Sequence, residues 1–247
     1  MATLSQNVAQ AISDLSSIKT AIQAKGVTVP ANTPTSQYGS LIGDIPSGAN
    51  FEQIKALIER PTGTTFDIPH GITQIGSYAL YYCTYHTVTV PSSVTQIKTK
   101  AFFGSSIYIL TLSEGLQSIE QDAIRYCNQL TSLTIPASVT SVSTGGIGNC
   151  SDLSSLTILP TAAQFQSTAF YNCVKLSTVT LSNGFDCLNL NLSYSTLYTE
   201  AMIVSWLNAL KDNTGQTAKT LTIGAANLAK LTAEEIAIAT NKNWNLA

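Results

Sequence analysis

Cysteine is the residue type in this chain whose spacing most invites chemistry. A column of thiols could hold a metal ion or carry redox chemistry, but a zinc site needs ligands that converge as closely spaced pairs. Cysteines separated by whole repeat units supply no such pairs. The sequence therefore predicts small buried side chains that fill a tight corner, with no metal and no cofactor. The column consists of Cys83, Cys127, Cys150 and Cys173, with Ser105 in the remaining position.

A second candidate is the C-x-x-H spacing of Cys83 and His86, which could pair a nucleophile with its base. By its distance from the cysteine, His86 aligns with Leu130, so we interpret it as a substitution at the edge of a repeat. The acidic pair Glu120 and Asp122 is expected in solvated positions. No G-x-S-x-G, H-E-x-x-H or P-loop motif occurs. Without a convergent nucleophile, base and oxyanion donor, the sequence predicts a protein that is not an enzyme.

Hydroxyl side chains form two further columns with the same period. On stacked strands they would make a flat, uncharged surface with rows about 4.8 Å apart, suited to a saccharide or to ice. The plainer interpretation is that threonine fits any half-exposed strand position, and both interpretations stay open. The candidate ligand-binding residues are Thr87, Thr89, Thr111, Ser132, Thr134, Ser155, Thr157, Thr178 and Thr180.

These columns must be positioned by an internal repeat. One apolar column advances in nearly constant steps through Ile68, Val90, Leu112, Ile135, Ile158 and Leu181. Each unit begins with an alternating segment such as 133–136, which places apolar residues on one face of a short strand. The rest of the unit turns the chain back. Because one unit cannot bury its apolar edge alone, stacked copies are expected to share a core, which predicts an α/β repeat solenoid.

The repeat pattern, best seen in residues 66–90 (FDIPHGITQIGSYALYYCTYHTVTV) and 123–139, resembles the BspA-type leucine-rich repeats. That family occurs in bacterial surface proteins and in phage and prophage tail proteins. The resemblance covers about 66–185 and implies a leucine-rich-repeat-like right-handed coil with a parallel β-sheet on one face. The chain departs from the pattern at 144–148 and at 159–160, where we expect the loops to bend differently. The predicted repeat domain is 64–186.

The N-terminal region 1–26 is predicted to be an oligomerising helix. Its apolar residues follow the 4-3-4-3-4 spacing of a coiled-coil seam, which indicates a homo-oligomer, with a trimer as the favoured form. The alternative, an amphipathic helix that packs on its own domain, stays open. Residues 27–63 form a predicted linker with short helices, and this end of the chain resembles phage and prophage tail-fibre proteins of Gram-positive hosts. The seam consists of Leu4, Val8, Ala11, Leu15, Ile18 and Ile22.

The C-terminal region 187–247 is predicted to be a mixed α/β cap, because the last unit of a solenoid must shield an open edge. A helix is expected over 199–211 and a strand over 219–224. Thr232 and Glu235 have the spacing of a capping box at the start of a last helix that ends near Asn241. Trp206 and Trp244 are expected to anchor the core of this cap.

Composition excludes some function classes. Charged residues are 11% of the chain and the net charge is −2, so there is no basic stripe for a nucleic-acid partner. No apolar run approaches the ~20 residues of a membrane-spanning helix, and residues 1–10 lack the features of a secretory signal.

The resemblances imply a phage or prophage tail-associated receptor-binding protein located in the virion tail, with a cell-surface saccharide or protein receptor and other tail proteins as partners. The alternative is a cell-surface or secreted leucine-rich-repeat adhesin that contacts host matrix or other cells.

Overall fold

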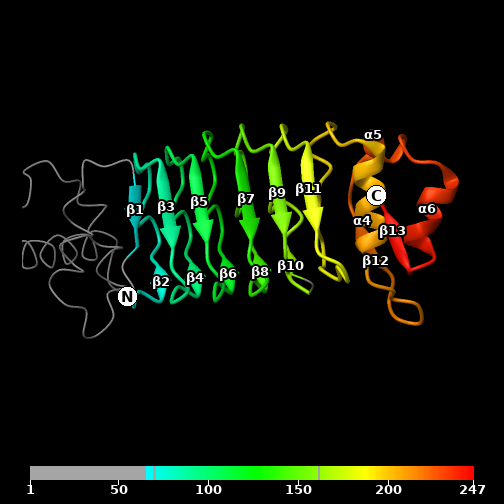
Figure 1. Ribbon diagram of the computed structural model, residues 1–247, viewed down its shortest axis with the longest axis horizontal. Coiled ribbons are helices and arrows are strands. Elements are labelled where there is room, and N and C mark those ends of the chain that lie inside the picture. The colour runs from blue at the N-terminus through cyan, green and yellow to red at the C-terminus, as the bar shows by residue number, and fades with distance from the viewer. Residues whose placement is uncertain (1–64, 69–70, 161) are drawn as a thin grey trace, which may run out of the picture.

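The computed structural model describes residues 65–68, 71–160 and 162–247, and in this part the chain forms a solenoid of stacked coils (Figure 1). Each coil contributes one strand to a row of parallel strands along one side of the molecule. This confirms the predicted repeat solenoid. The row consists of β1 (Thr65–Asp67), β3 (Thr87–Val90), β5 (Ile109–Leu112), β7 (Ser132–Ile135), β9 (Ser155–Ile158) and β11 (Thr178–Leu181).

The register of these strands follows the sequence repeat. Val90 of β3 lies opposite Leu112 of β5, and Ile135 of β7 lies opposite Ile158 of β9, so each apolar residue meets its equivalent in the next coil. Within each strand, buried and more exposed residues alternate, because successive side chains of a strand point to opposite faces. The buried faces form one continuous apolar core along the solenoid.

The row of strands is interrupted between β5 and β7, at the point where the shorter coils give way to the longer ones. It forms two three-stranded sheets, β1-β3-β5 and β7-β9-β11, in place of the single sheet expected from the sequence. Across this break, both carboxylate oxygens of Glu114 accept hydrogen bonds, at 3.0 Å, from the backbone N–H groups of Ala137 and Ser138. These bonds, that of Ala137 first, lower the pKa of Glu114 below its ordinary value.

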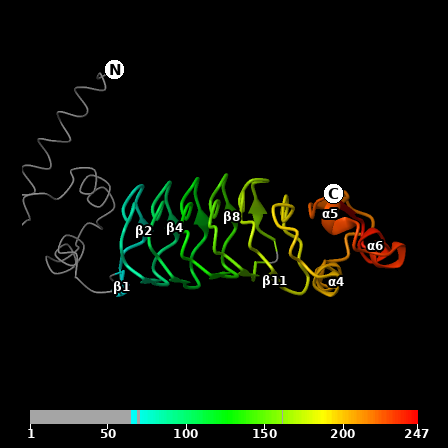
Figure 2. The same ribbon diagram turned by 90° about the horizontal axis from the view of Figure 1, so that it is seen from above.

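A second sheet lies on another side of each coil, and it continues past the break. The sequence predicts only a turning segment here, because strands of two residues are too short to show alternation. The coils stack along a single axis (Figure 2), so their short strands form an unbroken five-stranded sheet. It consists of β2 (Gln74–Ile75), β4 (Gln96–Ile97), β6 (Ser118–Ile119), β8 (Ser141–Val142) and β10 (Gln164–Phe165).

Backbone turns with left-handed residues join the two sheets and bond to one another between coils. The N–H of Ile124 donates to the carbonyl of Gly146 at 2.7 Å, as equivalent groups do in neighbouring coils. The expected change of bend at 144–148 is wrong, because Gly145 (φ 62°) keeps the left-handed conformation of Asp122 (φ 55°) in the coil before it. An added Cβ at Gly145 would lie 2.5 Å from Oδ1 of Asp122, so a larger residue here would have to displace that side chain. At 159–160 the N–H of Leu159 still donates to the carbonyl of Ile135 in the preceding coil, at 3.1 Å.

The cap closes the C-terminal edge of the repeats, as predicted. Trp206 is fully buried, and its Nε1–H donates to the carbonyl of Val179 in β11 at 2.7 Å. An edge strand otherwise presents unpaired backbone groups, so this indole replaces the partner that a further coil would supply. The cap consists of α4 (Glu200–Ala209), β12 (Lys219–Leu221), α5 (Ala225–Leu228), α6 (Ala233–Thr240) and β13 (Trp244–Leu246).

Most details of the cap agree with the sequence, with two additions. Thr232 and Glu235 form the predicted capping box, and Trp244 is buried like Trp206. The short helix α5 and the strand β13, which pairs with β12, were not predicted. The N-terminal predictions lie outside the described residues. They are the oligomerising helix 1–26 with its six seam residues and the linker 27–63.

Candidate functional site

The predicted hydroxyl columns lie together on the outer face of the main strands. Thr89 lies opposite Thr111, and Thr134 lies opposite Thr157, so side chains of one column occupy adjacent rows of each sheet. All the candidate residues are exposed or half-buried. Parallel strands hold neighbouring rows about 4.8 Å apart. The face is therefore a regular, flat array of hydroxyl groups, built by strand alternation and by the repeat register.

This array is chemically uniform over most of its length. In the described part of the chain, none of the candidate hydroxyl groups donates to or accepts from another protein group. Their hydrogen-bonding capacity is free to meet a ligand or water. Thr65 and Asp67 of β1 continue the two columns at the N-terminal end. These two residues were not among the predicted candidates.

One residue breaks the columns at the boundary between the two sheets. Ile109 stands in the column that otherwise holds Thr87 and Ser132, and 57% of its surface is exposed. Tyr108 beside it is also exposed, and its ring packs edge-on against His86 at 5.0 Å between centroids. An apolar and aromatic patch therefore separates the hydroxyl array into two halves.

The cysteine column has a structural role that goes beyond filling space. The predicted burial is confirmed, and the thiols also donate to backbone carbonyls of the preceding coil. Cys127 lies 3.2 Å from the carbonyl of Phe102, and Cys150 lies 3.0 Å from that of Ile124. Ser105 makes the same contact with Leu80 at 2.7 Å, which explains why serine replaces cysteine in that coil.

These thiols are poorly suited to nucleophilic chemistry. The hydrogen bond with Cys127, the neighbouring thiol, raises the pKa of Cys150 well above its ordinary value, and burial acts in the same direction. Burial likewise raises the pKa of Cys187 to about 11. A thiolate is the reactive form of cysteine, so Cys150 and Cys187 stay protonated at neutral pH. Among the described residues, no three His, Cys, Asp or Glu side chains are grouped to hold a metal ion.

Two expectations about titratable residues are wrong. His86 is not equivalent to Leu130: it pairs with Tyr108 of the next coil, whose N–H donates to the His86 carbonyl at 2.8 Å. The shorter coils have one residue fewer between the cysteine column and the strand, and counting from the cysteine therefore shifts the alignment. Asp122 is buried and ion-paired with Arg125 at 3.0 Å. Glu120 is half-buried and pairs with Lys98 at 3.0 Å.

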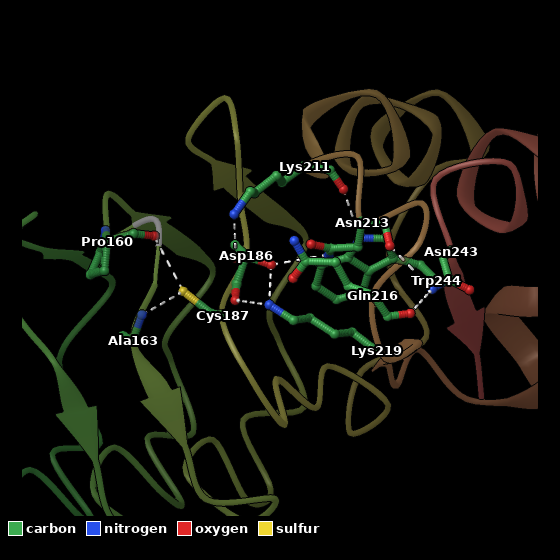
Figure 3. Close-up of polar contacts among 10 residues, drawn as sticks. All are labelled: Pro160, Ala163, Asp186, Cys187, Lys211, Asn213, Gln216, Lys219, Asn243 and Trp244. Atoms are coloured by element: carbon green, nitrogen blue, oxygen red, sulfur yellow. Dashed lines mark hydrogen bonds and ion pairs between the residues drawn. The ribbon is translucent and has the colours of Figure 1, made fainter.

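A further polar cluster joins the repeats to the cap (Figure 3). Asp186, just after the last repeat strand, pairs with Lys211 at 3.0 Å and with Lys219, and it accepts from Nδ2 of Asn213 at 3.0 Å. Burial alone would raise the pKa of Asp186, but the hydrogen bonds from Lys219, Lys211 and Asn213 leave it below its ordinary value. The carboxylate therefore ties two segments of the cap, the loop after α4 and strand β12, to the end of the repeats.

No helix in the described part of the chain is long and apolar enough to cross a membrane.

Comparison with known proteins identifies the repeat. Residues 59–177 match the family model of the BspA type leucine rich repeat region, in six copies. No curated protein matches the chain in sequence.

Two solved structures of leucine-rich proteins are similar to this chain over part of its length. A leucine rich cell surface protein from Faecalibacterium prausnitzii is 22% identical with a TM-score of 0.46; the match covers 61% of this chain and 36% of that one. The T. pallidum leucine rich repeat protein is 23% identical with a TM-score of 0.47, over 58% of this chain and 82% of that one. The chain thus spans little more than a third of the first of these proteins. The sequence of residues 59–177, just under half of the chain, is thus similar to BspA type leucine-rich repeats.

Proposed function

We propose that this protein binds a saccharide on a bacterial cell surface through the hydroxyl array of its main strands, without catalysis. The observation that carries the proposal is the in-register pair of hydroxyl columns, whose groups have no protein partner in the described part of the chain. A saccharide presents donors and acceptors at repeated spacing along a polymer. A flat uncharged array can satisfy many of them at once, and each hydrogen bond contributes modestly.

The role that fits this binding best is that of a receptor-binding protein in a phage or prophage tail. This proposal rests on the sequence: residues 1–26 carry a heptad seam that would join copies of the chain as a trimer, and this end resembles tail-fibre proteins. Several copies held together would raise weak saccharide affinity through multivalency. Other tail proteins would be the remaining partners. A cell-surface or secreted adhesin is the alternative, since the BspA-type family also occurs there.

The test combines charge substitutions with a matched control. Thr134→Lys and Thr157→Lys place long cationic side chains in the middle of the array, where rows about 4.8 Å apart leave no room for a ligand to pass them. We expect both variants to lose binding of the labelled full-length protein to bacterial cells and to cell-wall polysaccharide. Gln117→Lys makes the same charge change beside the second sheet and is expected to retain binding.

Circular dichroism and thermal unfolding would verify that each variant is folded. Full binding by folded Thr134→Lys and Thr157→Lys variants would contradict the assignment of this face. Binding to host matrix proteins but not to bacterial polysaccharide would favour the adhesin. Measurement of the mass in solution, with and without residues 1–26, tests the trimer, and a monomer in both cases would contradict it.

A further inference from the structure

An aromatic cluster covers the turns of the first three coils, on a different side of the solenoid from the hydroxyl array. The rings of Tyr81 and Phe103 are stacked at 5.3 Å between centroids, and Tyr82 packs edge-on against Tyr81 at 4.5 Å. Tyr126 continues the cluster, 5.1 Å from Phe103. Although the rings touch one another, 58% of the surface of Tyr82 is exposed, and Tyr126 is exposed too. Exposed aromatic patches of this kind mark interaction sites.

The backbone of these tyrosines indicates that the rings are not there for stability. Tyr82 (φ 49°) and Tyr126 (φ 59°) occupy left-handed positions, which are unfavourable for a bulky side chain. At the same position of other coils, the chain uses Gly104 and Asn149, which adopt this conformation at lower cost. Tyr78, at the other left-handed position of the first coil, is also a bulky residue in this unfavourable conformation, with φ 64°. Strain concentrated in exposed residues is a sign of a functional surface.

The cluster also carries the positive charge of Lys100. Lys100 Nζ lies 5.6 Å from the ring centre of Tyr78 and 5.7 Å from that of Phe103. Within the described ranges, Lys100 forms no ion pair, whereas neighbouring Arg125 is neutralised by Asp122. The chain as a whole has a net charge of −2, so this unopposed cation is a local feature. It would complement an anionic group placed beside the rings.

We propose that this flank, formed by Tyr78, Tyr81, Tyr82, Lys100, Phe103 and Tyr126, is a binding site for an anionic saccharide. The apolar face of a sugar ring packs on an exposed aromatic face, and the phenolic hydroxyl groups supply hydrogen bonds. Lys100 binds a phosphate or carboxylate substituent. Ligand sites generally combine aromatic surface with a few placed polar groups, as this flank does. The site is separate from the hydroxyl array, so the inference does not depend on the function proposed for that face.

The test uses the full chain and three synthetic oligosaccharides with the same backbone, bearing a phosphate, a carboxylate or no charge. The charged glycans are expected to bind more tightly than the neutral one. The ratio of the affinities for the phosphate-bearing and the carboxylate-bearing glycan shows which of the two anionic groups the site prefers. Tyr82→Asn and Tyr126→Asn are each expected to weaken binding at least about tenfold. Because asparagine suits the left-handed conformation, their unfolding midpoints should stay equal or rise. Lys100→Gln should abolish the preference for charged glycans.

Two controls make the outcome decisive. Tyr171→Asn removes an exposed tyrosine that lies outside the cluster and has no left-handed backbone, and it is expected to retain affinity. Thr134→Lys alters only the hydroxyl array, so its effect separates failure of that proposal from failure of this one. Equal binding of neutral and charged glycans, no binding of any of them, or full affinity in Tyr82→Asn would overturn the inference. A lower unfolding midpoint in Tyr82→Asn would also overturn it, because the rings would then serve packing.

Discussion

Replacement of Trp206 by phenylalanine tests how the cap closes the repeats. The substitution removes the Nε1–H that donates to the Val179 carbonyl at 2.7 Å and leaves that acceptor buried without its partner, which costs about 1–3 kcal/mol. The smaller ring also leaves a cavity in a fully buried position beside Tyr198, whose ring lies 4.8 Å away, and this adds roughly 1 kcal/mol. We therefore expect Trp206→Phe to lower the free energy of unfolding by about 2–4 kcal/mol.

Urea unfolding measures this loss directly, and hydrogen exchange locates it. If the indole protects the repeat edge, the amides of β11 should exchange faster in Trp206→Phe than in the wild type, while those of β3 should change little. Asn208→Ala, on the exposed side of the same helix, is the control and should stay within about 0.5 kcal/mol of the wild type. A Trp206→Phe variant with unchanged stability and unchanged exchange in β11 would refute the capping role.

Two further predictions concern contacts between coils. Glu114→Gln should slightly reduce the free energy of unfolding at neutral pH, because the backbone donors that this exposed carboxylate binds lower its pKa. The difference from the wild type should shrink as the pH falls below about 4.5 and through that lowered pKa. A difference in urea unfolding that does not depend on pH would contradict this. Gly145→Ala should destabilise more than Gly184→Ala, since both have positive φ but only at Gly145 would the new Cβ meet a neighbour, at 2.5 Å. The left-handed conformation alone costs about 1–2 kcal/mol, so equal thermal unfolding of the two variants would show that the clash is relieved.

The repeat could be predicted because its signal is redundant. Apolar positions such as Val90 and Leu112 recur together with the cysteine column, and each column independently fixes the period of the solenoid. The second sheet was missed because its strands, such as Gln96–Ile97, have only two residues and acquire their regularity from stacking. The equivalence of His86 was misjudged for a related reason. The one-residue difference between the shorter and the longer coils falls between two columns, and only the register of the strands places it.

The candidate site was predicted in position but not in detail. Strand alternation was enough to place Thr134 and Thr157 on one outer face. The aromatic flank was missed because the left-handed backbone of Tyr82 and Tyr126 is visible only in the structure, and the residue type at this position changes from coil to coil. Their exchange with Gly104 at the same position was the available signal.

The interruption between β5 and β7 limits the length of the continuous hydroxyl surface on the outer face. Each half of the face offers three consecutive strands, and three rows span about 10 Å from first to last. A polymer whose repeat matches the strand spacing could contact the hydroxyl groups of one half. At the boundary it would meet the exposed Ile109, and the regular pairing of strands ends there. If the face binds a saccharide as proposed, each copy of the chain would offer two separate three-stranded surfaces, and a long polymer would be bound in separate segments.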